Sequence, residues 1–565
     1  MKSINIRFRL LQTGIYFLLP LLLLSSCDKY LDRLPDNRTE INSVEKVRKL
    51  LVSAYSSTTY VRHFEYSSDN MDFAGEKNPN TSPLIEQAYN WEQMTEAENE
   101  SNVNTWQNYY KMIATANAAL EAIENCGTPD EMLPYKGEAL MCRAYAHLCL
   151  TMMYCLPYHP DYASRYLGVP YISAPETTLN PKYVRGTLEE DYQKIQKDIE
   201  EALPLMADDA YSVPKYHFNK KAAYALATRF YCYSMQWEKA VQAANMVLGS
   251  APEEMLRDWG EAAGLAWGYD IRTMDYIDPV HKFNLLLIPV FTGNGYLFNA
   301  WSGSGSRYTH NNRVAKTETF RCKRPMAGPY DSGKADCYHI YRHAPFLWYD
   351  NVTNKVWMPK WPTQWEIVDA VAGTGYTRST FVALTTNEVL LNRAEAYIQL
   401  KEYDKAAADL DCWNNSFFKV GQYGVRHLTT EVIEDVYCNP SSPFYIAEYT
   451  REAPTGRKAL HPHGFTVEDG TQEAMTQCLL FCRRLDFLGE GLRWIDIKRY
   501  GITVDRFDDT NYIDESTTGF QATASLPYND LRRAFQLPQQ SIVTGLEPNP
   551  ADNAENSSHP FVSQY

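Results

Sequence analysis

Two stretches of the chain read NKKAAYALATRFYCYSMQWEKAVQAANMVL (Asn219–Leu248) and NEVLLNRAEAYIQLKEYDKAAADL (Asn387–Leu410). In each, apolar residues recur three or four positions apart on both sides of a short break, which is typical of two amphipathic helices joined by a turn. The second helix of each pair begins with an aromatic residue, and Ala240 or Ala406 follows three positions later. Because small residues let paired helices approach closely, we expect hairpins of the tetratricopeptide type.

Helical periodicity recurs elsewhere in the chain. It predicts helices over Ser43–Tyr55 with Ser43 as N-cap, over Trp106–Ile123, from Pro134 to a stop at Pro157, and over Thr187–Leu203. The last begins with Thr187-Leu188-Glu189-Glu190, the pattern of a capping box. No fixed 34-residue period runs through the chain, so the repeat is degenerate. The fold class predicted is α-dominated, built from tetratricopeptide-like pairs.

Two stretches lack this periodicity. One runs from Tyr60 to Asn90 and reads as a polar and aromatic loop. The other, from about 251 to 376, accumulates Gly, Pro, Ser and Trp. A long irregular insertion in a helical protein is usually functional or disordered, and its aromatic content argues against disorder. We therefore expect a loop-rich insertion that binds a ligand.

The N-terminus has the features of an export signal. Three basic residues precede an apolar run from Leu10 to Leu24 that is too short to span a bilayer. Leu24-Ser25-Ser26-Cys27 then forms a lipobox, in which Cys27 receives the lipid and becomes the first mature residue. We predict a signal peptide over 1–26, a lipid anchor in the membrane at Cys27, and a single domain over 27–565. The alternative is an ordinary secretory signal cut elsewhere.

Composition narrows the functional classes. The net charge is -15 and no Lys/Arg-rich stripe lies outside the signal, which argues against nucleic acid as a partner. The spacings of Cys142 with Cys149, and of Cys478 with Cys482, suit helix faces, so we expect core thiols and no metal. The G-x-x-x-x-G-K match at 328–334 is followed by Ala335 where a phosphate loop needs Ser or Thr, so no cofactor is expected. His339 and His343 lack the Glu and the third ligand of a zinc site.

Aromatic content suggests the ligand. The chain has 41 Tyr, 12 Trp and 22 Phe, and sugars present flat C–H faces to such rings and hydroxyls to polar groups. The candidate ligand-binding residues come from the two irregular stretches: Tyr66, Asp69, Asn70, Asp72, Trp301, Arg307, Tyr308, Trp348, Trp357 and Trp361, with Trp365 in reserve. For each, the alternative is that an aromatic ring packs in the interior or that a loop Asp or Asn caps a turn.

The whole chain resembles the SusD/RagB family of nutrient-binding outer-membrane lipoproteins. The resemblance rests on Cys27–Asp32, on Trp106 with Tyr110 and Asn117, on Arg143-Ala144-Tyr145 followed by Leu167-Gly168-Val169-Pro170, and above all on RLDFLGEGLRWIDIKR (Arg484–Arg499), which is similar to the family's Arg-rich helix. Leu492 stands where a His is frequent, and Asp486 where a Glu is usual. The resemblance implies a right-handed superhelix of helical pairs, with the scaffold over about 40–250 and 380–500.

The resemblance also implies partners and a location. Members of the family sit as a lid on a TonB-dependent outer-membrane transporter and deliver oligosaccharides or, in some branches, peptides. We therefore expect a glycan ligand, no catalytic residues, and a lipid-anchored protein on the outer membrane that faces the exterior. Two alternatives stay open. A surface glycoside hydrolase needs two carboxylates that sequence spacing does not reveal, and a helical scaffold binding another protein leaves the aromatic insertion unexplained.

Overall fold

The computed structural model describes residues 41–563, apart from 76–77, 79, 98, 179–180, 267–268, 300–305, 328–347, 351–353, 358, 423 and 508–519. The signal peptide and Cys27 lie outside the described residues, as do Trp301, the 328–334 motif, His339 and His343. Trp348 and Trp357 are described by their backbone alone.

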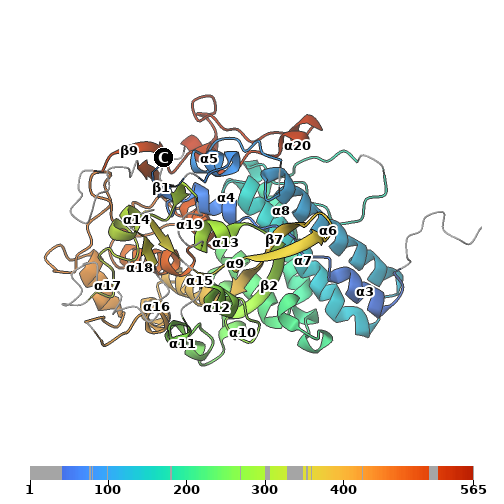
Figure 1. Cartoon of the computed structure of the whole chain (residues 1–565), viewed down its shortest axis with the longest axis horizontal. Helices are drawn as coiled ribbons and strands as arrows, with labels where there is room; N and C mark the ends of the chain where they lie inside the picture. The colour runs from blue at the N-terminus through green and yellow to red at the C-terminus, as the bar shows by residue number, and fades with distance from the viewer. Residues whose placement is uncertain are drawn as a thin grey trace, which may run out of the picture.

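Helices dominate the described chain (Figure 1). The larger scaffold helices are α3 (Val44–Leu51), α6 (Asn102–Asn125), α7 (Leu133–Tyr154), α8 (Leu188–Ala202), α9 (Lys220–Tyr233), α10 (Trp237–Leu248), α15 (Thr386–Gln399), α16 (Tyr403–Phe417), α17 (Thr430–Tyr437), α18 (Thr471–Asp486) and α19 (Leu492–Arg499). Each of the helices predicted from periodicity is present, with Ser43 as the N-cap of α3 and both halves of the capping box at the start of α8.

The two predicted hairpins are α9 with α10 and α15 with α16, and α10 also packs on α15. The small residues Ala240, Ala244, Ala394 and Ala406 are buried at these interfaces. The prediction of an α-dominated fold built on tetratricopeptide-like pairs is confirmed. The four cysteines predicted as core thiols, Cys142, Cys149, Cys478 and Cys482, are buried and free.

Residues of the Arg143 motif hold three scaffold helices together. Arg143 on α7 forms two hydrogen bonds with Asp198 on α8, of 2.8 and 2.7 Å, and a third with Asn117 on α6, of 2.9 Å. The Tyr110 hydroxyl on α6 donates to the carbonyl of Pro170. Bidentate Arg–carboxylate geometry fixes orientation as well as distance, so these residues set how α6, α7 and α8 lie against one another.

Between α10 and α15 the chain forms short elements and a sheet. The helices are α11 (Trp259–Gly264), α12 (Tyr269–Tyr276), α13 (Asn294–Asn299) and α14 (Asn312–Thr317). An antiparallel sheet of order β2-β7-β6 is built from β2 (Asn284–Phe291), β7 (Thr374–Thr385) and β6 (Gln364–Asp369).

The other described strands form two-stranded pairs, some of which join distant parts of the chain. They are β1 (Asp72–Phe73) with β3 (Tyr308–Thr309), β4 (Trp348–Asp350) with β5 (Lys355–Trp357), and β8 (Val504–Phe507) with β9 (Ala522–Leu526). The short helices α20 (Gln539–Val543) and α21 (Pro560–Ser563) follow near the C-terminus.

The prediction of a loop over Tyr60–Asn90 was wrong in part, because this stretch contains α4 (Val61–Ser67) and α5 (Pro83–Tyr89). Nearly every side chain of α4 is buried, including the polar His63 and Glu65. A helix buried on all sides has no polar face, so periodicity does not reveal it. The candidate residue Tyr66, which lies on α4, is therefore inside the molecule.

The Arg484–Arg499 segment is two helices rather than one. The turn between α18 and α19 contains Gly489 and Gly491, whose φ angles of 82° and 84° favour glycine. One carboxylate oxygen of Glu65 on α4 accepts the N–H groups of both glycines, at 3.0 and 2.8 Å. Burial raises the pKa of Glu65 to about 7. The N-terminal segment is thereby attached to the turn that orients α19.

Candidate functional site

The four candidates from the first irregular stretch lie in the interior. Tyr66 is buried with its ring 6.1 Å from that of Phe298. Asn70 is buried and donates to Glu65 at 3.1 Å. Tyr66, Asp69, Asn70 and Asp72 are thus all buried, and a ligand-binding role for them stays a prediction.

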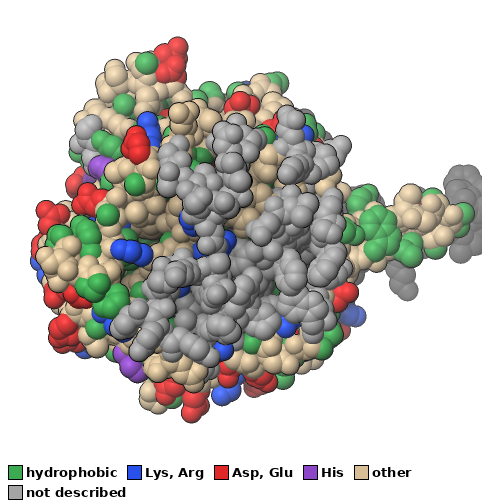
Figure 2. Space-filling view, turned by 60° about the vertical axis from the view of Figure 1, so that its left-hand side comes forward, with side chains coloured by type: hydrophobic (Ala, Val, Ile, Leu, Met, Phe, Trp, Pro, Cys, Tyr) green, Lys and Arg blue, Asp and Glu red, His purple; other side chains and the backbone are tan. Residues whose placement is uncertain are grey.

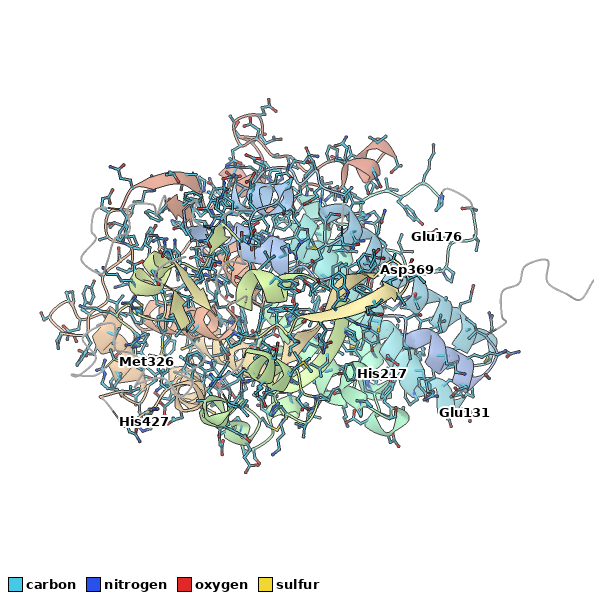
Figure 3. The ribbon with its side chains drawn as sticks, viewed as in Figure 1. Glu131, Glu176, His217, Met326, Asp369 and His427 are labelled. Atoms are coloured by element: carbon cyan, nitrogen blue, oxygen red, sulfur yellow. The ribbon has the colours of Figure 1, made fainter. Side chains whose placement is uncertain are left out.

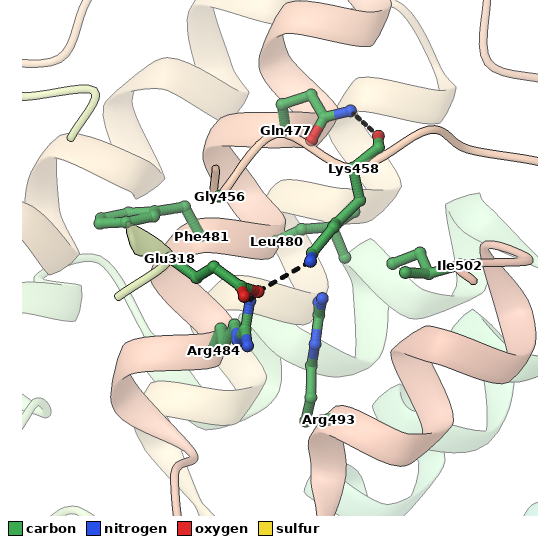
Figure 4. Close-up of a pocket in the computed structure, with 9 residues that line it drawn as sticks. All are labelled: Glu318, Gly456, Lys458, Gln477, Leu480, Phe481, Arg484, Arg493 and Ile502. Carbon is green, nitrogen blue, oxygen red and sulfur yellow. Dashed lines mark hydrogen bonds and ion pairs between the residues drawn. The ribbon is translucent and has the colours of Figure 1, made fainter. Parts of the chain in front are cut away.

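Asp69 belongs to a buried ionic network, shown in part in Figure 4. Arg493 forms two hydrogen bonds with its carboxylate, both of 2.8 Å, and Arg484 lies 3.4 Å away. Burial alone raises the pKa of Asp69, but the two guanidinium groups outweigh it and the pKa lies below its usual value. The charged carboxylate is therefore held by cations of α18 and α19.

Glu318 is the second acid of this network. It pairs with Lys458 at 2.7 Å, with Arg484 at 3.0 Å and with Arg313 at 3.0 Å. Burial opposes its ionisation, but Lys458, Arg484 and Arg313 lower its pKa to about 2. The cavity beside these groups has a volume of about 10 Å³. That is room for about one water molecule and not for a sugar, so the network is structural.

A row of aromatic rings reaches the surface beside the β1–β3 pair. Half-buried Tyr308 lies 4.2 Å from the buried ring of Tyr89 and 5.8 Å from half-buried Phe73, measured between ring centres. The guanidinium carbon of Arg506 lies 4.0 Å from the Tyr89 ring centre and 4.6 Å from that of Trp91. We call Phe73, Tyr308, Tyr89, Arg506 and Trp91 the aromatic row.

Asp72 fixes the inner end of the aromatic row. Its Oδ1 accepts the Tyr89 hydroxyl at 2.7 Å, and its Oδ2 accepts Arg313 Nε at 2.9 Å. Arg506 donates to the backbone carbonyls of Tyr66, Ser68, Met71 and Tyr89. The buried polar residues therefore position the row, while Phe73 and Tyr308 remain partly open to solvent.

Of the candidate residues, Tyr308 belongs to the aromatic row, and Arg307 directly precedes it in the chain. Arg307 donates its backbone N–H to Asn80 at 2.7 Å and its Nε to the carbonyl of Asn78 at 3.3 Å. Burial raises the pKa of the Tyr308 hydroxyl, so the group is a neutral hydrogen-bonding phenol at physiological pH. The ring of Tyr308 and the guanidinium of Arg307 thus come from adjacent, half-buried residues.

Trp361 lies in the interior. It is buried, donates its indole N–H to the carbonyl of Gly489 at 2.8 Å, and stacks on Phe381 with 5.7 Å between ring centres. The preceding Lys360 donates to Glu490 at 2.6 Å. Trp361 therefore attaches the insertion to the turn before α19, and its role in ligand binding stays a prediction.

The other candidate tryptophans are Trp348, Trp357, Trp301 and Trp365. Trp348 and Trp357 are opposite each other in the register of β4 and β5. Their role in binding stays a prediction, as does that of Trp301. Trp365, held in reserve, is 56% exposed on β6.

Sequence reasoning missed Phe73, Tyr89, Trp91 and Arg506. Phe73 and Tyr89 lie in the stretch from Tyr60 to Asn90, which the sequence had already singled out as polar and aromatic. Their position in the same stretch as Asp72 was the signal that could have found them. Arg506 is far away in the chain, and no local pattern connects it to Tyr89. Among the residues with described placement, no group of three or more His, Cys, Asp or Glu is arranged to hold a metal ion.

On the uncovered part of the face in Figure 2, acidic side chains lie at the top, on the left and along the lower rim, and basic ones are scattered without forming a stripe. Within the part of the chain that the structure describes, no helix has both the length and the apolar character to cross a bilayer.

Comparisons with known proteins agree with this fold. Residues 29–232 match the family SusD-like_3, described as starch-binding associating with outer membrane. A SusD superfamily protein from Bacteroides thetaiotaomicron is similar over 89% of this chain and 98% of its own, with 17% identity and a TM-score of 0.58. A SusD-like carbohydrate binding protein from Bacteroides vulgatus covers 92% and 97%, with 15% identity and a TM-score of 0.54.

A laminarin binding SusD-like protein is similar over 90% of this chain and 99% of its own, with 16% identity and a TM-score of 0.52. No curated protein gives a significant match. At these identities the structural likeness establishes the fold, and the binding properties belong to the neighbours.

Proposed function

We propose that the chain is a SusD-like protein that binds an oligosaccharide, because its fold and the sequence of residues 29–232 are similar to those of SusD-like proteins. The observation that carries this proposal is the ring of Tyr308, half-open to solvent and supported from behind by Tyr89. A sugar ring stacks its C–H face on such a surface, and Arg307 beside it offers donors to hydroxyl groups. The names of the laminarin-binding and carbohydrate-binding neighbours support the same ligand class.

We further propose that the protein is anchored by lipid at Cys27 to the outer membrane, with residues 27–565 as one domain facing the exterior. The lipobox and the description of the matched family support this location. A TonB-dependent outer-membrane transporter is the proposed recipient of the ligand, on the family resemblance.

Replacing Cys27 with alanine in the full chain is expected to release most of the protein from membranes, because the acyl chains that contribute about 0.8 kcal/mol per buried methylene are lost. Fractionation of cells into soluble and membrane parts measures the change. Replacing the exposed Cys438 with alanine provides the control. Unchanged partition of the Cys27 variant into membranes would exclude lipid anchoring.

Binding without catalysis is part of the proposal. Incubating the purified protein with polysaccharides and measuring reducing ends separates it from a glycoside hydrolase, which would release them. A peptide-binding protein of the same fold is the other candidate. Retention on no glycan of a panel, together with binding to peptides, would favour that candidate instead.

Replacing Tyr308 with alanine in the form that lacks residues 1–27 is expected to weaken glycan binding about tenfold, since an aromatic stacking contact contributes about 0.5–1.5 kcal/mol beyond its buried area. Affinity electrophoresis across a panel that includes laminarin measures this. Tyr397→Ala removes a half-buried tyrosine of the scaffold helix α15 and serves as control. Equal loss in both variants, or none in Tyr308→Ala, would remove the aromatic row from the site.

A further inference from the structure

Strand β6 forms one edge of the β2-β7-β6 sheet. Within the described residues, no strand pairs with its outer side. Trp365 is 56% exposed and Ile367 is 60% exposed, and they lie on the same side of the strand because side chains alternate. Asp369 marks the end of the strand at the tip of the hairpin and is labelled in Figure 3.

The direction of the backbone groups of β6 follows from its neighbour. Thr377 on β7 accepts the N–H of Thr292 at 3.0 Å, so its backbone polar groups face the β2 side. Thr377 and Gly375 are two positions apart on one strand and therefore point the same way. Trp365 and Ile367 stand opposite these two residues. They form non-hydrogen-bonded pairs with β7, and their own N–H and C=O groups point outward from the sheet.

The opposite edge of the sheet is closed. Pro289 on β2 has no N–H, and the Phe291 N–H donates to the carbonyl of Ser57 at 2.9 Å. Natural sheets protect an edge with proline, with charged side chains such as lysine, or by covering it. Strand β6 reads QWEIVD and has neither proline nor lysine. Among the described residues, the β6 edge is therefore unpaired and has exposed apolar side chains and outward backbone groups.

The two carboxylates of β6, Glu366 and Asp369, differ in their partners. Glu366 pairs with Arg378 at 2.5 Å, which neutralises it. Asp369 accepts only the backbone N–H groups of Val371 and Ala372, at 2.8 and 2.9 Å, among its described contacts. A partner strand with a basic side chain near Asp369 complements this charge.

We propose that β6 accepts an extended segment of a partner polypeptide as the fourth strand of the sheet. The outward N–H and C=O groups of Trp365 and Ile367 bond to the partner backbone, and its apolar side chains pack on the exposed side chains of these two residues. A basic side chain of the segment lies near Asp369. This protein-binding edge is distinct from the glycan site proposed at Tyr308 and does not depend on it.

The test uses the chain that lacks residues 1–27 and a blocked synthetic peptide of alternating valine and lysine, with binding measured by calorimetry. Ile367→Pro removes an outward N–H and no bond to β7, so the fold tolerates it while binding falls about tenfold or more. Ile367→Ala keeps the N–H and loses less. Thermal unfolding followed by circular dichroism establishes that each variant is folded.

A second pair of variants covers the case in which proline disturbs the hairpin. Ile367→Lys places a charge on the edge, and Val371→Lys adds the same charge at a fully exposed turn residue. Loss of binding in the first and retention in the second supports the proposal. Equal binding by all variants indicates general attraction to the negative chain and overturns it. The proposal also fails if the native chain does not bind the peptide, or if it self-associates through an edge that Ile367→Pro blocks.

Discussion

Replacing Asp69 with alanine is expected to lower the free energy of unfolding by about 4 kcal/mol, because removing one partner from a buried ion pair leaves the other charge uncompensated. Arg493 and Arg484 are both buried and would lose this carboxylate. Denaturation in urea, followed by circular dichroism, measures the change. The effect should exceed that of any exposed ion pair in the chain.

The control for Asp69 is Glu402→Ala. Glu402 pairs with Lys405 at 2.6 Å, but both side chains are exposed, and exposed pairs contribute little to stability. Its denaturation midpoint should equal that of the native chain. Similar midpoints for the two variants would mean that solvent reaches the network, and the structural assignment of Asp69 would have to be abandoned.

Replacing Arg506 with methionine is expected to cost about 4 kcal/mol of unfolding free energy and to abolish glycan binding. Methionine fills the space of the side-chain stem but donates no hydrogen bond. Four buried carbonyls, those of Tyr66, Ser68, Met71 and Tyr89, lose their donor, and each unsatisfied buried group costs about 1–3 kcal/mol, with incomplete additivity. The Tyr89 ring also loses the cation that lies over it.

Two measurements separate the consequences of Arg506→Met. Denaturation gives the stability, and affinity electrophoresis at low temperature gives the binding of the fraction that is folded. Arg506→Lys keeps the charge with fewer donors and should be intermediate. Arg532→Met is the control, since Arg532 is partly exposed and pairs with the nearby Asp530. Full glycan binding by folded Arg506→Met would show that the row does not depend on this residue.

The two hairpins and the helices α3, α6, α7 and α8 were predictable because their signals are local. A capping box joins Thr187 and Glu190, three residues apart, and an apolar stripe repeats within each helix. The helix α4 was not predictable in this way, because burial on every side removes the polar face on which the periodicity depends.

The candidate site was predictable only in outline. Sequence patterns singled out the stretch around Asp69 to Asp72 and the pair Arg307 and Tyr308, since aromatic and polar residues are concentrated there. They did not distinguish Asp69, an interior ion-pair residue, from Tyr308, which is half-open to solvent. Nor did they reveal that Trp361 is attached to Gly489.

The sequence by itself determined the helical pairs and the capping box of α8, because these depend on residues within a few positions of one another. Only the tertiary structure decided which polar and aromatic side chains are interior and which are open to a ligand. The physical reason is that a buried charge requires a partner, and the partner of Asp69, Arg493, lies 424 residues away in the chain.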